Sequence, residues 1–163
     1  ATSVRALALL ARALPRQVDD PQDLDARLEA QLGAWLAATS IRRTEYGASH
    51  GLGHALGADA GVPHGITSCV LLPTVMRFNA EVCAPQMAEI AAALGDASRP
   101  AADQVEALIA NLGLPTRLSQ LGIGHDRLAV IAQKGMANPW VHTNPRKISD
   151  AAQLEALLKQ AWA

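Results

Sequence analysis

The chain has 163 residues, half of them hydrophobic and only 3% aromatic, with a formal net charge of −1. This length suits one domain with a sizeable core, so residues 1–163 are predicted to form a single domain. The balanced charge gives no electrostatic reason to expect a nucleic acid or an acidic membrane as partner. No apolar run is long enough to span a bilayer. The chain has two cysteines, Cys69 and Cys83, which are expected to be reduced thiols in the core. These features predict a cytoplasmic protein.

The first third of the chain has the periodicity of two amphipathic helices. Apolar residues from position 4 to position 14 mark the first helix, which Pro15 is expected to end. Asp20 is expected to cap the second helix and Pro21 to occupy its first position. The apolar stripe of this second helix consists of Leu24, Leu28, Leu32, Trp35 and Leu36.

The rest of the chain also favours helices. A third helix is predicted to contain His50 and His54 and to stop near Gly57. The apolar run 66–75 contains Pro73. It could form either a helix or a strand, because periodicity alone cannot assign so short a run. Further helices are expected at 81–94, at 101–112, at 126–136 and after a Ser149 cap, with Gly95 and Gly113 as C-terminal caps. Because convincing strand alternation is absent, the predicted fold class is all-α, a bundle-like helical domain.

Three of the five histidines, His50, His54 and His64, lie within fifteen residues. The first two are four residues apart, so they share one face of a helix. A lone histidine is usually an ordinary core or surface residue, whereas three together favour a metal or catalytic site. His125 and His142 have no such neighbours and are expected to be structural.

Several motifs resemble those of the iron-containing alcohol dehydrogenase family. They are the segment from Gly47 to Gly57, then Pro63-His64-Gly65, Cys69-Val70-Leu71-Leu72-Pro73 and Arg77-Phe78-Asn79. Histidine spacings of four and ten with a Pro-His-Gly triplet are specific to this family and its dehydroquinate synthase-like relatives. The maleylacetate reductase-like branch looks nearest. The resemblance covers essentially the whole chain and only the C-terminal half of a family member, which implies the helical metal-binding domain of that family.

The resemblance also implies roles for the three histidines. The first and third would be metal ligands, so that His50 and His64 hold Fe²⁺ or Zn²⁺. The middle one would be catalytic, so that His54 relays a proton or orients the substrate. Neutral imidazoles suit both ions, and a metal with an open position polarises an alcohol or carbonyl oxygen. The implied function is that of a metal- and NAD(P)-dependent oxidoreductase. Its substrate would be a small molecule, either an alcohol or carbonyl compound or maleylacetate. The protein could also form a homodimer, which the sequence does not decide.

Two parts of the family pattern have no match in the sequence. The family's other two metal ligands, an Asp and a His one helical turn apart, would require Asp-x-x-x-His, which does not occur. The glycine-rich phosphate loop of an N-terminal NAD(P)-binding domain is not found either. The chain is therefore interpreted as part of a longer enzyme that is inactive on its own. The alternative is a non-catalytic helical fragment that serves interaction or oligomerisation.

Overall fold

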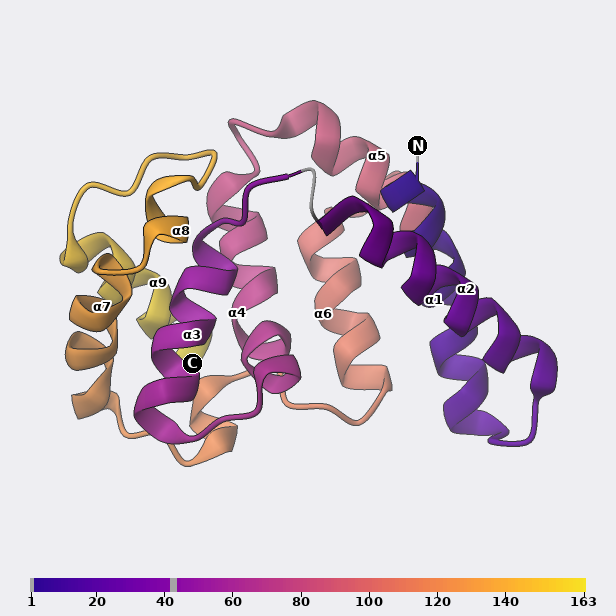
Figure 1. Cartoon of the computed structure of the whole chain (residues 1–163), viewed down its shortest axis with the longest axis horizontal. Helices are drawn as coiled ribbons and strands as arrows, with labels where there is room; N and C mark the ends of the chain where they lie inside the picture. Colours follow the sequence, from indigo (N-terminus) through magenta and orange to yellow (C-terminus); the bar gives the residue numbers. More distant parts are fainter. Residues whose placement is uncertain (1, 42–43) are drawn as a thin grey trace. The chain divides into compact units, whose positions relative to one another are not determined.

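A computed structural model describes residues 2–41 and 44–163, apart from the side chain of residue 40 (Figure 1). These residues form helices and connecting turns without a β-strand, so the predicted all-α fold is confirmed. Their contacts group into two compact units, Ala1–Thr44 with Ala84–Gly113 and Glu45–Cys83 with Leu114–Ala163. The assignment of all 163 residues to one domain stays a prediction. In the described part of the chain, no helix has both the length and the apolar character needed to cross a membrane.

The first unit contains four helices, in which α1 packs along α2 and also contacts α5 and α6 (Figure 1). Close packing is possible because small side chains form the interfaces: a Cβ added at Gly33 of α2 would lie 2.9 Å from Cγ of Leu10. The helix bounds are Thr2–Asp19 for α1, Leu24–Ile41 for α2, Ala84–Leu94 for α5 and Ala101–Asn111 for α6. The buried hydrophobic residues are Ala6, Leu9, Ala13, Ala26, Ala91, Ala101, Ala102, Val105 and Ile109.

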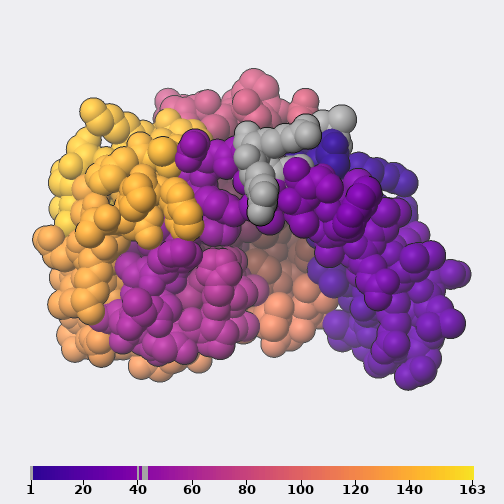
Figure 2. Space-filling model, viewed as in Figure 1, coloured from indigo at the N-terminus to yellow at the C-terminus, as the bar shows by residue number. Residues whose placement is uncertain are grey.

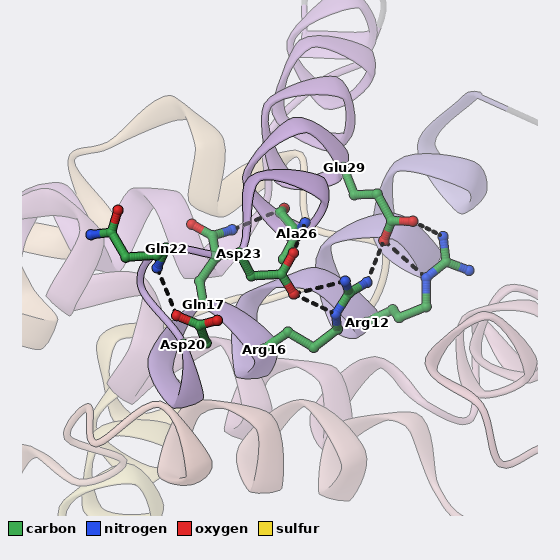
Figure 3. Close-up of polar contacts among 8 residues, drawn as sticks. All are labelled: Arg12, Arg16, Gln17, Asp20, Gln22, Asp23, Ala26 and Glu29. Carbon is green, nitrogen blue, oxygen red and sulfur yellow. Dashed lines mark hydrogen bonds and ion pairs between the residues drawn. The ribbon is translucent and has the colours of Figure 1, made fainter.

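The expectation that Pro15 ends the first helix is wrong, because α1 continues beyond it to Asp19. Proline removes one backbone hydrogen bond, and here contacts with α2 hold the last turn in place. Arg16 Nη2 donates to Asp23 Oδ2 at 2.7 Å, and Gln17 Nε2 donates to a backbone carbonyl of α2 at 3.2 Å (Figure 3). The tertiary contacts therefore outweigh the local preference of proline.

The cap of α2 is Asp23, so the expectation of a cap at Asp20 is wrong. Asp23 Oδ1 accepts from the backbone N–H of Ala26 at 2.9 Å, which is the bond of an N-cap. Asp20 instead accepts from the N–H of Gln22 at 2.9 Å and shapes the turn before the helix (Figure 3). The Ala26 amide first, and then the Arg16 guanidinium, hold the pKa of Asp23 below its ordinary value.

The predicted apolar stripe of α2 is not the face that packs against α1. Ala26 and Gly33 are buried, and Gly33 faces Leu10 of α1. Most of the stripe is exposed, as the side chains of Leu24, Leu28, Leu32 and Trp35 show. The small residues therefore determine which face of α2 contacts α1.

The second unit holds the larger apolar core, which forms where α3, α4, α7 and α9 pack together. The apolar run left open in the sequence is helical, and Pro73 lies inside α4. The bounds are Ala48–Ala60 for α3, His64–Asn79 for α4, Leu128–Met136 for α7, Pro139–His142 for α8 and Ala151–Trp162 for α9, with 3₁₀ turns η1 at Leu118–Leu121 and η2 at His125–Arg127. The largest fully buried side chains are Leu52, Leu56, Leu71, Leu118, Leu128, Ile131, Leu154 and Leu158.

The end of α3 lies beyond the predicted stop at Gly57. The helix runs to Ala60, and Gly61 ends it in the left-handed conformation with φ 66°. Asp59, in the last turn, has a nearly buried side chain that accepts hydrogen bonds from Lys134 and Arg127. The Lys134 bond first, and then the charge of Arg127, lower the pKa of Asp59. This carboxylate ties the end of α3 to η2 and α7.

Two other predicted caps are present and one is displaced. Gly95 and Gly113 follow α5 and α6 with φ of 114° and 71°, so these C-terminal caps are confirmed. Ser149 is not the cap of α9, because Asp150 accepts from the N–H of Gln153 at 2.9 Å. Ser149, one residue before the cap, instead donates its backbone N–H to Gln153 Oε1 at 2.9 Å.

Candidate functional site

The second unit brings His50, His54 and His64 together. The ring centroid of His64 lies 5.2 Å from that of His50 and 5.6 Å from that of His54. His50 and His54 are one turn apart on α3, and His64 is the first residue of α4. The clustering predicted from their spacing is therefore present in the structure.

Small residues on α3 let the start of α4 approach the histidines. A Cβ added at Gly53 would lie 2.9 Å from Oγ1 of Thr67, so only glycine leaves room for this contact. Thr67 donates its hydroxyl to the backbone carbonyl of His64 at 2.7 Å and is itself fully buried. The first turn of α4, which carries His64, is thereby fixed against the middle of α3.

Two aromatic side chains border the histidines. The ring of Tyr46 stacks on His50 at a centroid distance of 4.3 Å and an interplanar angle of 24°. The Trp140 ring contacts Tyr46 at 4.6 Å and meets His54 edge-to-face at 4.7 Å. Sequence reasoning missed both residues, and Trp140 comes from a segment far from the three histidines along the chain. One feature of the sequence could have pointed to them: aromatic residues are rare in this chain, which has only one tyrosine and three tryptophans.

The protonation state of His50 suits a metal ligand. Burial first, and then the neighbouring imidazoles of His64 and His54, lower the pKa of His50. A lowered pKa keeps the ring neutral, and the neutral imidazole is the form that coordinates a metal. His54 and His64 are exposed at the surface of the unit. His50 and His64 therefore offer two donors of the right chemistry side by side.

These donors do not by themselves make a complete site. Within residues 2–41 and 44–163, no three His, Cys, Asp or Glu side chains are placed to hold one ion. A tight zinc or iron site takes three or four protein ligands. The two imidazoles thus fit part of a divalent metal site and leave coordination positions for other donors.

The other histidines have contacts elsewhere in the unit. His125 packs edge-on against Trp162 at a centroid distance of 5.4 Å. The Nε2 atom of His142 lies 2.9 Å from the backbone oxygen of Met136, within hydrogen-bonding distance. Neither ring joins the cluster, which agrees with the structural role expected for both.

The segment around α8 packs directly on α3 beside the cluster. Figure 2 shows this segment, in orange, against α3, in purple. The contact depends on Gly51, where an added Cβ would lie 2.6 Å from Cγ2 of Val141 and 3.0 Å from its backbone nitrogen. Val141 is itself fully buried.

Gly51→Ala is therefore expected to destabilise the protein. The overpacking costs about 1–3 kcal/mol, which outweighs the gain of up to about 1 kcal/mol from the higher helix propensity of alanine. Denaturant unfolding measures the net loss. Gly65→Ala in α4 is the matched control, because nothing lies within 4 Å of a Cβ added there. If Gly51→Ala is as stable as the unsubstituted protein, α8 does not pack closely against α3 at this position.

The amino-acid sequence matches that of known proteins over almost its whole length. Residues 1–162 match the Fe-containing alcohol dehydrogenase family, C-terminal part. The maleylacetate reductase of Rhizobium sp. (strain MTP-10005) is 34% identical over 161 residues, which are 98% of this chain and 44% of that protein. The probable alcohol dehydrogenase EutG of Escherichia coli (strain K12) is 32% identical over 150 residues, which are 90% of this chain and 38% of that protein.

Solved structures share the fold. The maleylacetate reductase from Rhizobium sp. strain MTP-10005 superposes with a TM-score of 0.88 at 33% identity, over 99% of this chain and 44% of that chain. A 1,3-propanediol oxidoreductase superposes with a TM-score of 0.90 at 27% identity, over the same shares. The chain thus spans less than half the length of these relatives. The resemblance inferred from the histidine motifs is confirmed, and the chain belongs to the Fe-containing alcohol dehydrogenase family, whose C-terminal part it matches.

Proposed function

We propose that this chain is the metal-binding part of a metal- and NAD(P)-dependent oxidoreductase that interconverts an alcohol and a carbonyl compound. The observation that carries the proposal is the contact among His50, His54 and His64 at the junction of α3 and α4. Family membership over residues 1–162 supports it. Relatives whose names describe alcohol dehydrogenases and maleylacetate reductases support a small hydroxy or oxo compound as substrate.

In this proposal His50 and His64 are metal ligands. The lowered pKa of His50 and the contact between the two rings support this role. Fe²⁺ and Zn²⁺ both accept neutral imidazole, so the donors alone do not choose between them. Because two imidazoles are too few for a tight site, the proposal assigns the remaining donors to a part of the protein outside these 163 residues.

His54 is proposed to move a proton at the substrate. When bound, a divalent metal would polarise the alcohol or carbonyl oxygen, and a nicotinamide cofactor would take or give the hydride. A ring nitrogen of His54 accepts the hydroxyl proton when the alcohol is oxidised and returns it when the carbonyl is reduced. The Trp140 ring meets the imidazole edge-to-face, with the two ring centroids 4.7 Å apart. Trp140 also contacts Tyr46, whose ring stacks on His50.

Removal of the metal tests this function against the non-catalytic alternative. The full-length protein that contains this chain is treated with a chelator and then given Fe²⁺ or Zn²⁺, and NAD(P)H-linked turnover of alcohols, aldehydes and maleylacetate is measured at each step. We expect chelation to remove nearly all activity and one of the two ions to restore it. A metal-loaded protein without turnover would favour an interaction module instead. Full activity after complete metal removal would contradict the role of the histidines.

A further inference from the structure

We infer that Asn144 is a positioning residue of this site, which holds the start of α3 and with it His50. Asn144 and Asn79 are both buried, and their amides are paired reciprocally. Asn144 Nδ2 donates to Asn79 Oδ1 at 2.7 Å, and Asn79 Nδ2 donates to Asn144 Oδ1 at 3.1 Å. The pair joins the end of α4 to the loop that follows α8. This inference rests on the metal role proposed for His50.

Asn144 serves as the missing cap of α3. The residue at the N-cap position is Gly47, which has no side chain to accept from the first turn. Asn144 Oδ1 instead accepts from the backbone N–H of Ala48 at 3.1 Å, across 96 residues of sequence. A Cβ added at Gly47 would lie 3.0 Å from the same oxygen, so glycine makes this approach possible. A distant side chain thus satisfies one of the unpaired amides that begin every helix.

The same loop also holds the stacking partner of His50. Thr143 donates its hydroxyl to the backbone carbonyl of Tyr46 at 2.6 Å, and the Tyr46 ring stacks on His50. The Asn144 amide is fixed in turn, because its Nδ2 also donates to the carbonyl of Arg146 at 2.7 Å. His50 lies two residues beyond Ala48, in the turn of α3 that these bonds hold. Loss of the Asn144 side chain therefore releases this turn and the ring that it carries.

A positioning role predicts effects that a purely structural role does not. Both predict lower stability for Asn144→Ala, since the Asn79 amide and the backbone N–H of Ala48 lose their partner. Only positioning predicts that the change weakens metal binding more than an equally destabilising change elsewhere on α3. Asp59→Asn is the matched control, because Asp59 ties the opposite end of the same helix to α7 and touches none of the three histidines.

The experiment compares Asn144→Ala, Asn79→Ala, Asp59→Asn and His50→Ala in the full-length protein. Hydrogen exchange of the Ala48 amide reports on the helix start, and titration of the metal-free protein with Co²⁺ gives a dissociation constant. We expect Asn144→Ala to speed exchange at Ala48 and to raise the Co²⁺ dissociation constant about 10–100-fold, as is typical for partners that orient metal ligands. Asp59→Asn should change that constant by no more than about twofold, as for an independent site.

Asn79→Ala keeps the inference testable if Asn144→Ala does not fold. It keeps the Ala48 bond and removes the partner amide, together with the bond that this amide accepts from the Arg146 N–H at 3.4 Å. We therefore expect a smaller rise in the Co²⁺ dissociation constant. Unchanged binding in both asparagine variants would overturn the inference, as would an equal weakening in Asp59→Asn. If Ala48 exchange rises while His50→Ala itself leaves Co²⁺ binding intact, then the metal role of His50 fails and the capping of α3 by Asn144 stands.

Discussion

Replacement of His50 or His64 with alanine is expected to strip most of the bound metal from the full-length protein. In the proposed site this chain would contribute two imidazole donors, and each substitution removes one of them. Loss of a residue that merely orients a ligand weakens metal binding about 10–100-fold, so loss of a ligand itself should exceed that range. Elemental analysis after desalting measures the remaining metal, and competition with a chelator gives the affinity.

The control for this pair is His125→Ala. His125 belongs to the same unit and contacts Trp162 rather than the cluster. We expect this variant to keep its full metal content, because nothing places its ring near the other histidines. If His50→Ala or His64→Ala retains stoichiometric metal with unchanged affinity, that residue is not a ligand. Helical content measured by circular dichroism separates a lost ligand from a lost fold.

Local periodicity predicts much of this fold. The helices at 101–112 and 126–136 lie within a few residues of the observed α6 and α7, because each apolar face repeats with the helical period. The proximity of His50 and His54 follows from the same geometry, since residues four apart share a helix face. Even the approach of His64 could be anticipated, because a short loop returns the chain beside α3. These features depend on neighbours in the sequence.

Helix ends are harder to predict because neighbouring residues compete for them. Asp20 and Asp23 both precede the apolar run, and the proline after Asp20 favoured the wrong one. Ser149 and Asp150 differ by one position, and only the direction of the side chain decides which one caps α9. The first helix continues past Pro15 for a different reason, because contacts with α2 hold the turn that follows the proline. In each case the decisive contact is a matter of three-dimensional geometry.

The rest of the site depends on contacts between distant segments. Trp140 meets His54 and Asn144 caps α3, and no spacing in the sequence reports either contact. The leucine stripe of α2 shows the converse, because an apolar pattern that suggests a core face is exposed. The glycines at and around the first turn of α3 were the local hint. Gly47 and Gly51 are small where another segment approaches closely, although the sequence does not say which segment that is.

The role proposed for His54 separates a catalyst from a ligand in the same cluster. His54 lies on the face of α3 that carries His50, yet its ring meets Trp140 at 4.7 Å and is exposed toward solvent. A residue that moves a proton contributes to the transition state without holding the metal. His54→Ala is therefore expected to keep most of the metal and to lower turnover about 10²–10⁴-fold, the usual contribution of a general acid or base.

Metal content and steady-state rates are measured on the same preparations of His54→Ala, His50→Ala and His64→Ala. Turnover should fall in all three, and only His54→Ala should do so with its metal in place. Equal metal loss in the three variants would make His54 a third ligand. A His54→Ala protein with full metal and unchanged turnover would assign no catalytic part to this ring, and its contact with Trp140 would then be one of packing alone. Partial recovery of His54→Ala turnover by added imidazole would identify proton transfer as the lost step, because a free base can then take the place of the missing side chain.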